Sequence, residues 1–322
     1  MGGAELDCSD LENSALKPET SRMTSEDLPV TEQENPRTSN LSSLSSLDIV
    51  RAMNEEDSVV AAAVGAVLPE ISQAIDKIVA RMRSHGRLFY IGAGTSGRLG
   101  VLDAAECPPT FGVSPELVQA VIAGGYEACY RAVEASEDDS AAGIKDLEDR
   151  GFTKQDALVG IAASGRTPYT VGAVEWARER GAFTAAITCV PGSPITKAAE
   201  IAIVPDVGPE VVAGSTRLKA GTAQKMVLNM LSTATLVQLG YVTGNRMTNV
   251  HTRNTKLRAR ALRILMAEAG IDEQAAATFL DLTDGSLPLA LVMAQSGCEL
   301  NDARSALAAS SGVVHEAIKS LG

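Results

Sequence analysis

The feature that most constrains the fold is a repeat of short apolar runs and longer helical stretches that begins at Leu88. Each run has the length of a buried strand, and most of the segments between the runs have the length of a helix. Strands that alternate with helices pair in parallel through right-handed crossovers. The sequence therefore predicts an α/β fold with a parallel sheet. The expected strands are Leu88–Ile91, Leu117–Ile122, Leu158–Ala162, Thr184–Thr188 and Ile201–Val204.

The chain on either side of this repeat has a different character. Residues 1–46 hold nine acids and three bases with few large apolar side chains, which predicts a flexible acidic arm. Apolar residues then recur at helical spacing, which predicts a helical N-terminal segment over 47–77. A central domain over 78–241 should end in a long helix. Residues 242–322 are interpreted as a linker and a domain with helices only, with Asp272 as a helix cap and Asn301 at a helix start.

Composition excludes several classes of function. A net charge of −12 repels nucleic acid and anionic membranes, and 3% aromatic residues are too few for base-stacking surfaces. Five cysteines without a CxxC pair are typical of reduced thiols, and three scattered histidines argue against a metal site. No apolar run has the length of a membrane span. The simplest expectation is a cytoplasmic enzyme or small-molecule binding protein.

Two turns rich in glycine and hydroxyl groups follow the first and third expected strands, over residues 92–98 and 163–168. Free N–H groups and the helix dipole favour an anion where a strand meets a helix N-terminus, and hydroxyls donate to phosphate oxygens. The turns therefore predict a phosphate site, although tight strand-to-helix connections are the structural alternative. Either arginine of these turns could instead pair with a carboxylate to fix a loop. The candidate ligands are Thr95, Ser96, Gly97, Arg98, Ser164, Gly165, Arg166 and Thr167.

Gly92, Gly94 and Gly97 also match the GxGxxG dinucleotide fingerprint. That fingerprint needs an acidic residue at the end of the next strand, about 20 residues on, to bind the ribose. Here the next strand ends in Ala123 and two glycines, and Arg98 occupies the position after Gly97 where a Walker motif has lysine. We therefore expect no nicotinamide, flavin or other cofactor.

Two sets of carboxylates break local rules. Glu106 is expected on the apolar face of a helix that ends before Cys107–Pro109, so it faces the negative end of the helix dipole. Burial and the dipole would both favour its protonated form, as a general acid requires. The alternative is a side chain that reaches water at a frayed helix end. Glu137 lies in the acidic run 134–139, whose ordinary interpretation is a solvated helix end.

Taken together, these segments closely resemble bacterial N-acetylmuramic acid 6-phosphate etherases. The resemblance extends over roughly residues 31–322, and residues 1–30 have no counterpart in it. Ala135–Ser136 replaces a common Gly-Ala pair, and the spacing of the arm is loosened around Ser39–Ser46. The resemblance is carried by residues 90–100, 103–110, 133–138 and 160–169, and by the run 208–225, which is similar to a signature shared with the glucokinase regulatory protein.

The resemblance implies a sugar isomerase (SIS) domain, which is a doubly wound α/β sandwich, and a small helical domain similar to a ubiquitin-associated fold. It also implies a homodimer that acts in cell-wall sugar recycling. The positions that match the catalytic carboxylates are Glu106 and Glu137. His251 either assists opening of the sugar ring or is a structural histidine. Residues of the signature that could complete the pocket are Glu210, Ser215, Thr216 and Lys219, with an exposed helix face as the alternative for Lys219 and Lys225.

The implied reaction converts N-acetylmuramic acid 6-phosphate into N-acetylglucosamine 6-phosphate and D-lactate. Opening of the ring makes the proton on C2 acidic, a base removes it, an acid protonates the ether oxygen, and water adds after β-elimination. Such a carbon–oxygen lyase would use Glu106 as the acid and Glu137 as the base. Two other functions stay open: an aldose–ketose isomerase that expels no leaving group, and a sugar phosphate-sensing regulatory protein that needs neither glutamate.

Overall fold

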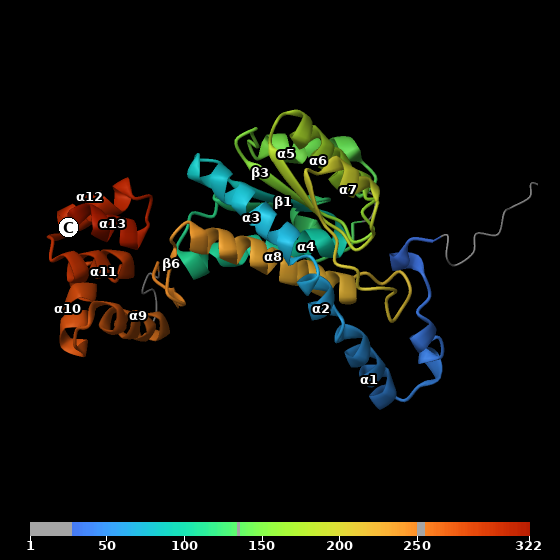
Figure 1. Ribbon diagram of the computed structural model, residues 1–322, viewed down its shortest axis with the longest axis horizontal. Coiled ribbons are helices and arrows are strands. Elements are labelled where there is room, and N and C mark those ends of the chain that lie inside the picture. Colours follow the sequence, from blue (N-terminus) through green and yellow to red (C-terminus); the bar gives the residue numbers. More distant parts are fainter. Residues whose placement is uncertain (1–27, 134–135, 250–254) are drawn as a thin grey trace, which may run out of the picture.

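A five-stranded parallel sheet forms the centre of the molecule in the computed structural model, which describes residues 28–133, 136–249 and 255–322 (Figure 1). The strand order is β2-β1-β3-β4-β5. Both ends of every strand lie within one residue of the predicted positions, which confirms the parallel sheet. The strands are β1 Leu88–Gly92, β2 Val118–Ile122, β3 Ala157–Ile161, β4 Phe183–Ile187 and β5 Ile201–Ile203.

Helices cover both faces of this sheet, and alternate strand residues point to opposite faces. Tyr90 and Val159 pack into one core cluster, whereas Phe89 and Leu158 pack into the other. This is the doubly wound SIS sandwich expected from the sequence. One face carries α3 (Leu68–Arg83), α4 (Gly94–Phe111) and α8 (Lys219–Gln238), and the other carries α5 (Ser140–Asp149), α6 (Pro168–Glu179) and α7 (Pro194–Ala198).

The segment before the sheet holds three short 3-10 helices (Val30–Glu32, Pro36–Thr38, Leu41–Ser43), then α1 (Ser46–Asp57) and α2 (Val60–Gly65). Over residues 28–46 the structure differs from the expected flexible arm. Thr31 and Thr38 are buried, because Thr38 Oγ1 donates to the Val211 carbonyl at 2.9 Å and Gly214 N donates to the Thr31 carbonyl at 3.0 Å. Residues 1–27 lie outside the described residues.

In the described part of the chain, no single helix is long and apolar enough to cross a membrane. The stretches Ser46–Gly65 and Leu68–Arg83 meet that test only together, as a pair bent by 56°. Of the two, α3 buries Ile71, Ile75 and Ile78 in the core of the central domain.

The chain after α8 first forms a small hairpin of β6 (Val242–Thr243) and β7 (Arg246–Met247), which corrects the expectation of helices only. Gly244 turns this hairpin with a φ of 59°. The helices that follow have a core of their own, and Asp272 caps one of them as predicted, accepting from Ala275 N at 2.8 Å. They are α9 (Thr255–Ala269), α10 (Glu273–Leu282), α11 (Leu287–Ser296), α12 (Leu300–Ala309) and α13 (Val314–Leu321).

Candidate active site

The two hydroxyl-rich turns lie side by side at the point where the sheet reverses its winding. Gly92 and Ile161, the last residues of β1 and β3, are partners in the sheet register. From β1 the chain crosses to β2 through α4 on one face, and from β3 it crosses to β4 through α6 on the opposite face. Connections that diverge in this way open a crevice beyond the strand ends, where doubly wound sheets bind their ligands.

Both turns present a helix N-terminus without a side-chain cap. Neither Ala93 before α4 nor Thr167 before α6 accepts a capping hydrogen bond through its side chain. The N–H groups at the start of α4 are therefore available to an anion. In α6, Pro168 has no N–H and Tyr169 N donates to the Glu137 carbonyl, so this turn offers its hydroxyls and the helix dipole. Thr95, Ser164 and Thr167 are half-buried at these turns. Together with the buried Ser96, they remain the candidate phosphate ligands.

Contacts and backbone conformation within this chain explain why each position of the GxGxxG run is glycine. A Cβ on Gly92 would lie 2.9 Å from the Ile161 carbonyl oxygen, and one on Gly97 would lie 2.6 Å from Ile122 Cγ1. Gly94 adopts a φ of 52°, a left-handed conformation that favours glycine. The three glycines let α4 start directly against the sheet.

Glu137 lies between the two turns. Its carbonyl accepts a hydrogen bond from Tyr169 N at 3.1 Å, at the start of α6. Its carboxylate Oε1 lies 3.2 Å from the place that a Cβ would occupy on Gly94, at the start of α4. The expectation of a solvated helix end fits the exposed Asp138 and Asp139 but not Glu137. Over its described residues 136–139, the acidic run is a loop that brings a carboxylate to the first turn, and Asp139 then caps α5.

Glu106 lies elsewhere, and two expectations about it are wrong. The helix α4 does not end there but continues through Pro108 and Pro109 to Phe111, closed by a hydrogen bond from Gly112 N to the Pro108 carbonyl. Glu106 is also exposed, as is Leu102 on the same face at 53%. At 1.5 Å per residue, about 18 Å of helix separates Gly94 from Glu106. The two glutamates of one chain therefore do not converge on one sugar.

The two arginines of the turns are placed differently. Arg98 donates from Nε to the Ala128 carbonyl at 2.8 Å and from Nη2 to the Arg131 carbonyl at 2.7 Å. It thus fixes the loop after β2, with carbonyl oxygens in place of the carboxylate considered from the sequence. Arg166 is exposed on the second turn, where its N–H donates to Ser164 Oγ at 3.4 Å.

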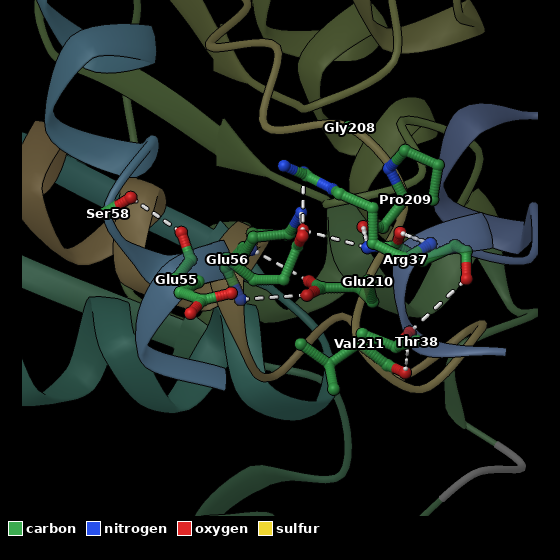
Figure 2. Close-up of polar contacts among 12 residues, drawn as sticks. Arg37, Thr38, Glu55, Glu56, Ser58, Gly208, Pro209, Glu210 and Val211 are labelled. Atoms are coloured by element: carbon green, nitrogen blue, oxygen red, sulfur yellow. Dashed lines mark hydrogen bonds and ion pairs between the residues drawn. The ribbon is translucent and has the colours of Figure 1, made fainter. Parts of the chain in front are cut away.

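The signature run contributes a buried ionic cluster that we call the Glu56 cluster: Asn35, Arg37, Glu56 and Lys219. Lys219 is 1% exposed, and its Nζ lies 2.6 Å from Glu56 Oε2. Glu56 also pairs with Arg37 at 2.7 Å and accepts from Asn35 Nδ2 at 2.8 Å. Figure 2 shows Arg37, Glu56 and Glu210 gathered from three segments of the chain. Lys219 is thus neither an open pocket residue nor part of an exposed face, whereas Lys225 is exposed.

Glu210 caps the start of α8 beside this cluster. Its two carboxylate oxygens accept hydrogen bonds from Lys219 N at 3.0 Å and Ala220 N at 2.9 Å. Burial raises the pKa of Glu210 above its ordinary value, and these hydrogen bonds offset only part of that. Burial also acts to raise the pKa of Glu56, but hydrogen bonds from Lys219 and Asn35 and the nearby cations hold it below the ordinary value. Ser215 and Thr216 are half-buried in the turn between Glu210 and α8.

A second buried cluster, which we call the Asp103 cluster, lies between the sheet and α8: Tyr90, Asp103, Asn229 and Ser232. Asp103 accepts from Tyr90 at 2.9 Å, from Asn229 at 2.6 Å and from Ser232 at 3.1 Å. Burial, with the nearby Asp103 charge, raises the pKa of Tyr90 well above its ordinary value and that of Cys107 to about 12. Sequence reasoning missed Glu56, which lies in no motif, and it missed the role of Asp103, because the run 103–110 drew attention only to Glu106.

Within the described residues, no group of three or more histidine, cysteine, aspartate or glutamate side chains could hold a metal ion. His251 lies outside the described residues. The neighbouring Asn249 approaches Gly112, at the C-terminal end of α4 and far from the phosphate turns.

Comparison with known proteins is consistent with this geometry. Residues 70–178 match the glucokinase regulatory protein N-terminal SIS domain, and residues 141–234 match the SIS domain. Proteins named N-acetylmuramic acid 6-phosphate etherase are similar over nearly their whole length. The relative from Brucella anthropi is 51% identical, with 90% of this chain and 94% of that protein covered. The relative from a Geobacillus species is 47% identical, with 90% and 98% covered. This chain therefore belongs to the N-acetylmuramic acid 6-phosphate etherase family.

Proposed function

We propose that this protein cleaves the D-lactyl ether of N-acetylmuramic acid 6-phosphate, as a carbon–oxygen lyase of cell-wall sugar recycling. The observation that carries the proposal is the position of Glu137 beside two uncapped helix N-termini. This arrangement puts a base and an anion site in one crevice. The names of the relatives support the same substrate.

The crevice suits the chemistry of β-elimination. The phosphate would bind the N–H groups at the start of α4 and the hydroxyls of Thr95, Ser96, Ser164 and Thr167. Glu137 would then remove the C2 proton of the open-chain sugar. The electron pair of that C–H bond forms the C2–C3 double bond as the C3–O bond breaks, and an acid protonates the lactate oxygen. Water added across the double bond gives N-acetylglucosamine 6-phosphate.

We further propose a homodimer in which Glu106 of a second copy supplies this acid. About 18 Å of helix separates Glu106 from the turn beside its own Glu137. Glu106 also lies on a face of α4 that exposes Leu102, Ala105 and Pro109. An apolar face of this kind is suited to a twofold contact, which would bring each Glu106 towards the crevice of the other chain.

The direct test is to incubate the protein with N-acetylmuramic acid 6-phosphate and to assay D-lactate. Glu137→Gln and Glu106→Gln should each lower kcat at least about a hundredfold, because each removes a proton-transfer group. Glu148→Gln, at an exposed position of α5, is the matched control and should retain activity. Near-wild-type turnover of Glu106→Gln would remove this residue from the mechanism.

The shared site has a separate test. After the two inactive variants are unfolded together and refolded, about half of the dimers carry one of each chain, and each of these has one intact site. Activity should return to about a quarter of the wild-type value. No recovery, with mixed dimers demonstrated, would contradict the shared site. A ketose product without lactate would instead identify an isomerase, and tight binding without any product would identify a sensor.

A further inference from the structure

The buried side chain of Gln224 packs behind the first of the two hydroxyl-rich turns. Gln224 lies on α8 and is 0% exposed, and its Oε1 accepts the Ser96 hydroxyl at 2.9 Å. Its Nε2 is buried and has no hydrogen-bond partner among the described residues. One turn earlier, a Cβ on Gly221 would lie 3.6 Å from Thr95 Cγ2. The start of α8 therefore packs directly behind the hydroxyls that we assign to phosphate.

In this arrangement Gln224 and a bound phosphate would compete for the single hydroxyl proton of Ser96. A serine hydroxyl has one proton to donate, whereas the oxygens of a phosphate dianion only accept. While Ser96 donates to Gln224, it has no proton for a phosphate. A buried donor without a partner, such as Gln224 Nε2, also costs free energy.

Rotation of the carboxamide by half a turn removes the conflict at Ser96 and gives Nε2 a partner, while Oε1 takes the buried position without one. Oxygen and nitrogen exchange places with almost no change of shape, so the surrounding core need not move. Nε2 then donates to Ser96 Oγ, and the Ser96 proton is free to point at the phosphate. We propose that Gln224 is a positioning residue, whose amide orientation decides whether Ser96 donates inward or to the substrate phosphate. This inference rests on the phosphate role of the α4 turn in the proposed function.

Gln224→Glu is the sharpest variant when it is assayed at a pH high enough to ionise the buried carboxyl, because an ionised carboxylate can only accept and so keeps the Ser96 proton turned inward. We expect the KM for the sugar phosphate and the inhibition constant of inorganic phosphate to rise about tenfold, with kcat within about twofold. Gln238→Glu, exposed near the end of the same helix, is the control and should change neither constant. An unchanged inhibition constant in a folded Gln224→Glu protein would overturn the proposal.

A double-mutant cycle with Ser96→Ala separates this role from simple charge repulsion or loosened packing. If Gln224 acts through Ser96, Gln224→Glu should add almost nothing to the roughly tenfold phosphate loss of Ser96→Ala. Losses that multiply to about a hundredfold would contradict the proposal. A Ser96→Ala protein with unchanged phosphate inhibition would instead contradict the proposed phosphate site itself.

Gln224→Met serves if Gln224→Glu does not fold, since it fills the space without a donor or an acceptor. It leaves the Ser96 proton free but undirected, so the inhibition constant of phosphate should rise about two- to threefold. This smaller rise should likewise vanish in the Ser96→Ala background. An undiminished rise in that background would overturn the proposal.

Discussion

Glu56 and Asp103 are both buried carboxylates, and the groups around them differ in kind. Glu56 is held by an ammonium, a guanidinium and an amide, whereas Asp103 accepts only from neutral groups, two hydroxyls and an amide. The partners of Glu56 come from the segment before the sheet and from the start of α8, where Lys219 lies 163 residues away. Those of Asp103 come from β1 and α8 of the central domain.

The difference indicates two uses of a buried charge. The Glu56 cluster ties the segment before the sheet to the turn that starts α8, at the edge where the crevice lies. Its energy depends on charge balance, so loss of one cation leaves an uncompensated ion. The Asp103 cluster holds α4 and α8 on the sheet through several hydrogen bonds from neutral donors. Loss of one donor therefore removes one hydrogen bond.

Lys219→Met should have the largest effect, because Glu56 then stays buried without its closest cation. We expect the free energy of unfolding in urea to fall by about 3–5 kcal/mol. Lys225→Met, on the exposed face of the same helix, should change it by less than about 0.5 kcal/mol. Adding Glu56→Gln to Lys219→Met should recover part of the loss. A loss below about 1 kcal/mol for Lys219→Met would show that the ion pair is not what holds this region.

The pH dependence of stability should separate Glu56 from Glu210. The folded-state pKa of Glu56 is lowered, so its contribution is complete above 4.5 and is lost as pH falls below that value. The folded-state pKa of Glu210 is raised, so its contribution is complete below 4.5 and is lost as pH rises through the folded-state value. In unfolding titrations from pH 3 to 7, Glu56→Gln should flatten the rise of stability with pH, and Glu210→Gln should steepen it. Equal slopes in the two variants would contradict these assignments.

Tyr90→Phe tests the neutral cluster. It removes one of three donors to Asp103 without changing the shape of the ring, so we expect a loss of about 1 kcal/mol in urea unfolding. Tyr241→Phe is a comparison at a tyrosine whose hydroxyl reaches the Ser311 carbonyl at 3.3 Å. A loss for Tyr90→Phe as large as that for Lys219→Met would erase the distinction between the clusters.

Arg37→Gln should have the smallest effect, because the Arg37 side chain is 64% exposed and water screens its pairing with Glu56. We expect a loss of less than about 1 kcal/mol, which should shrink further in 1 M salt. A larger loss that is insensitive to salt would mean that both cations of the Glu56 cluster act as buried charges.

The sheet was predictable because buried parallel strands are continuous apolar runs that end at glycine, as at Leu88–Gly92. The position of the phosphate turns followed from the same pattern, since the ends of parallel strands share one edge. The end of α4 was not predictable from Pro108 and Pro109. Each proline lacks the N–H that would bond to the carbonyl one turn earlier, and its ring crowds that carbonyl, but only two residues of α4 follow Pro109.

The burial of Lys219 was not predictable either, because helical periodicity describes one helix and Glu56 belongs to another far along the chain. The position of the Glu137 carboxylate was also not predictable from local sequence. Its acidic run has the composition of a solvated surface, and only the close approach of Gly94 reveals that its carboxylate lies at the phosphate turn. Local patterns thus located the backbone of the site, and long-range pairing decided which charges line it.

The glycine spacing of the α4 turn also affects how such a site could change its ligand during evolution. Gly92 and Gly97 are fixed by backbone and side-chain atoms of this chain, at 2.9 Å and 2.6 Å from any added Cβ. Thr95 and Ser96, which lie between them, have no positive φ and already carry side chains in α4. A lineage could therefore exchange the hydroxyls, and with them the ligand, while every viable descendant kept the glycines. If two proteins share only these glycines, the similarity indicates a shared fold. Similarity in the residues between the glycines would be needed to indicate a shared function.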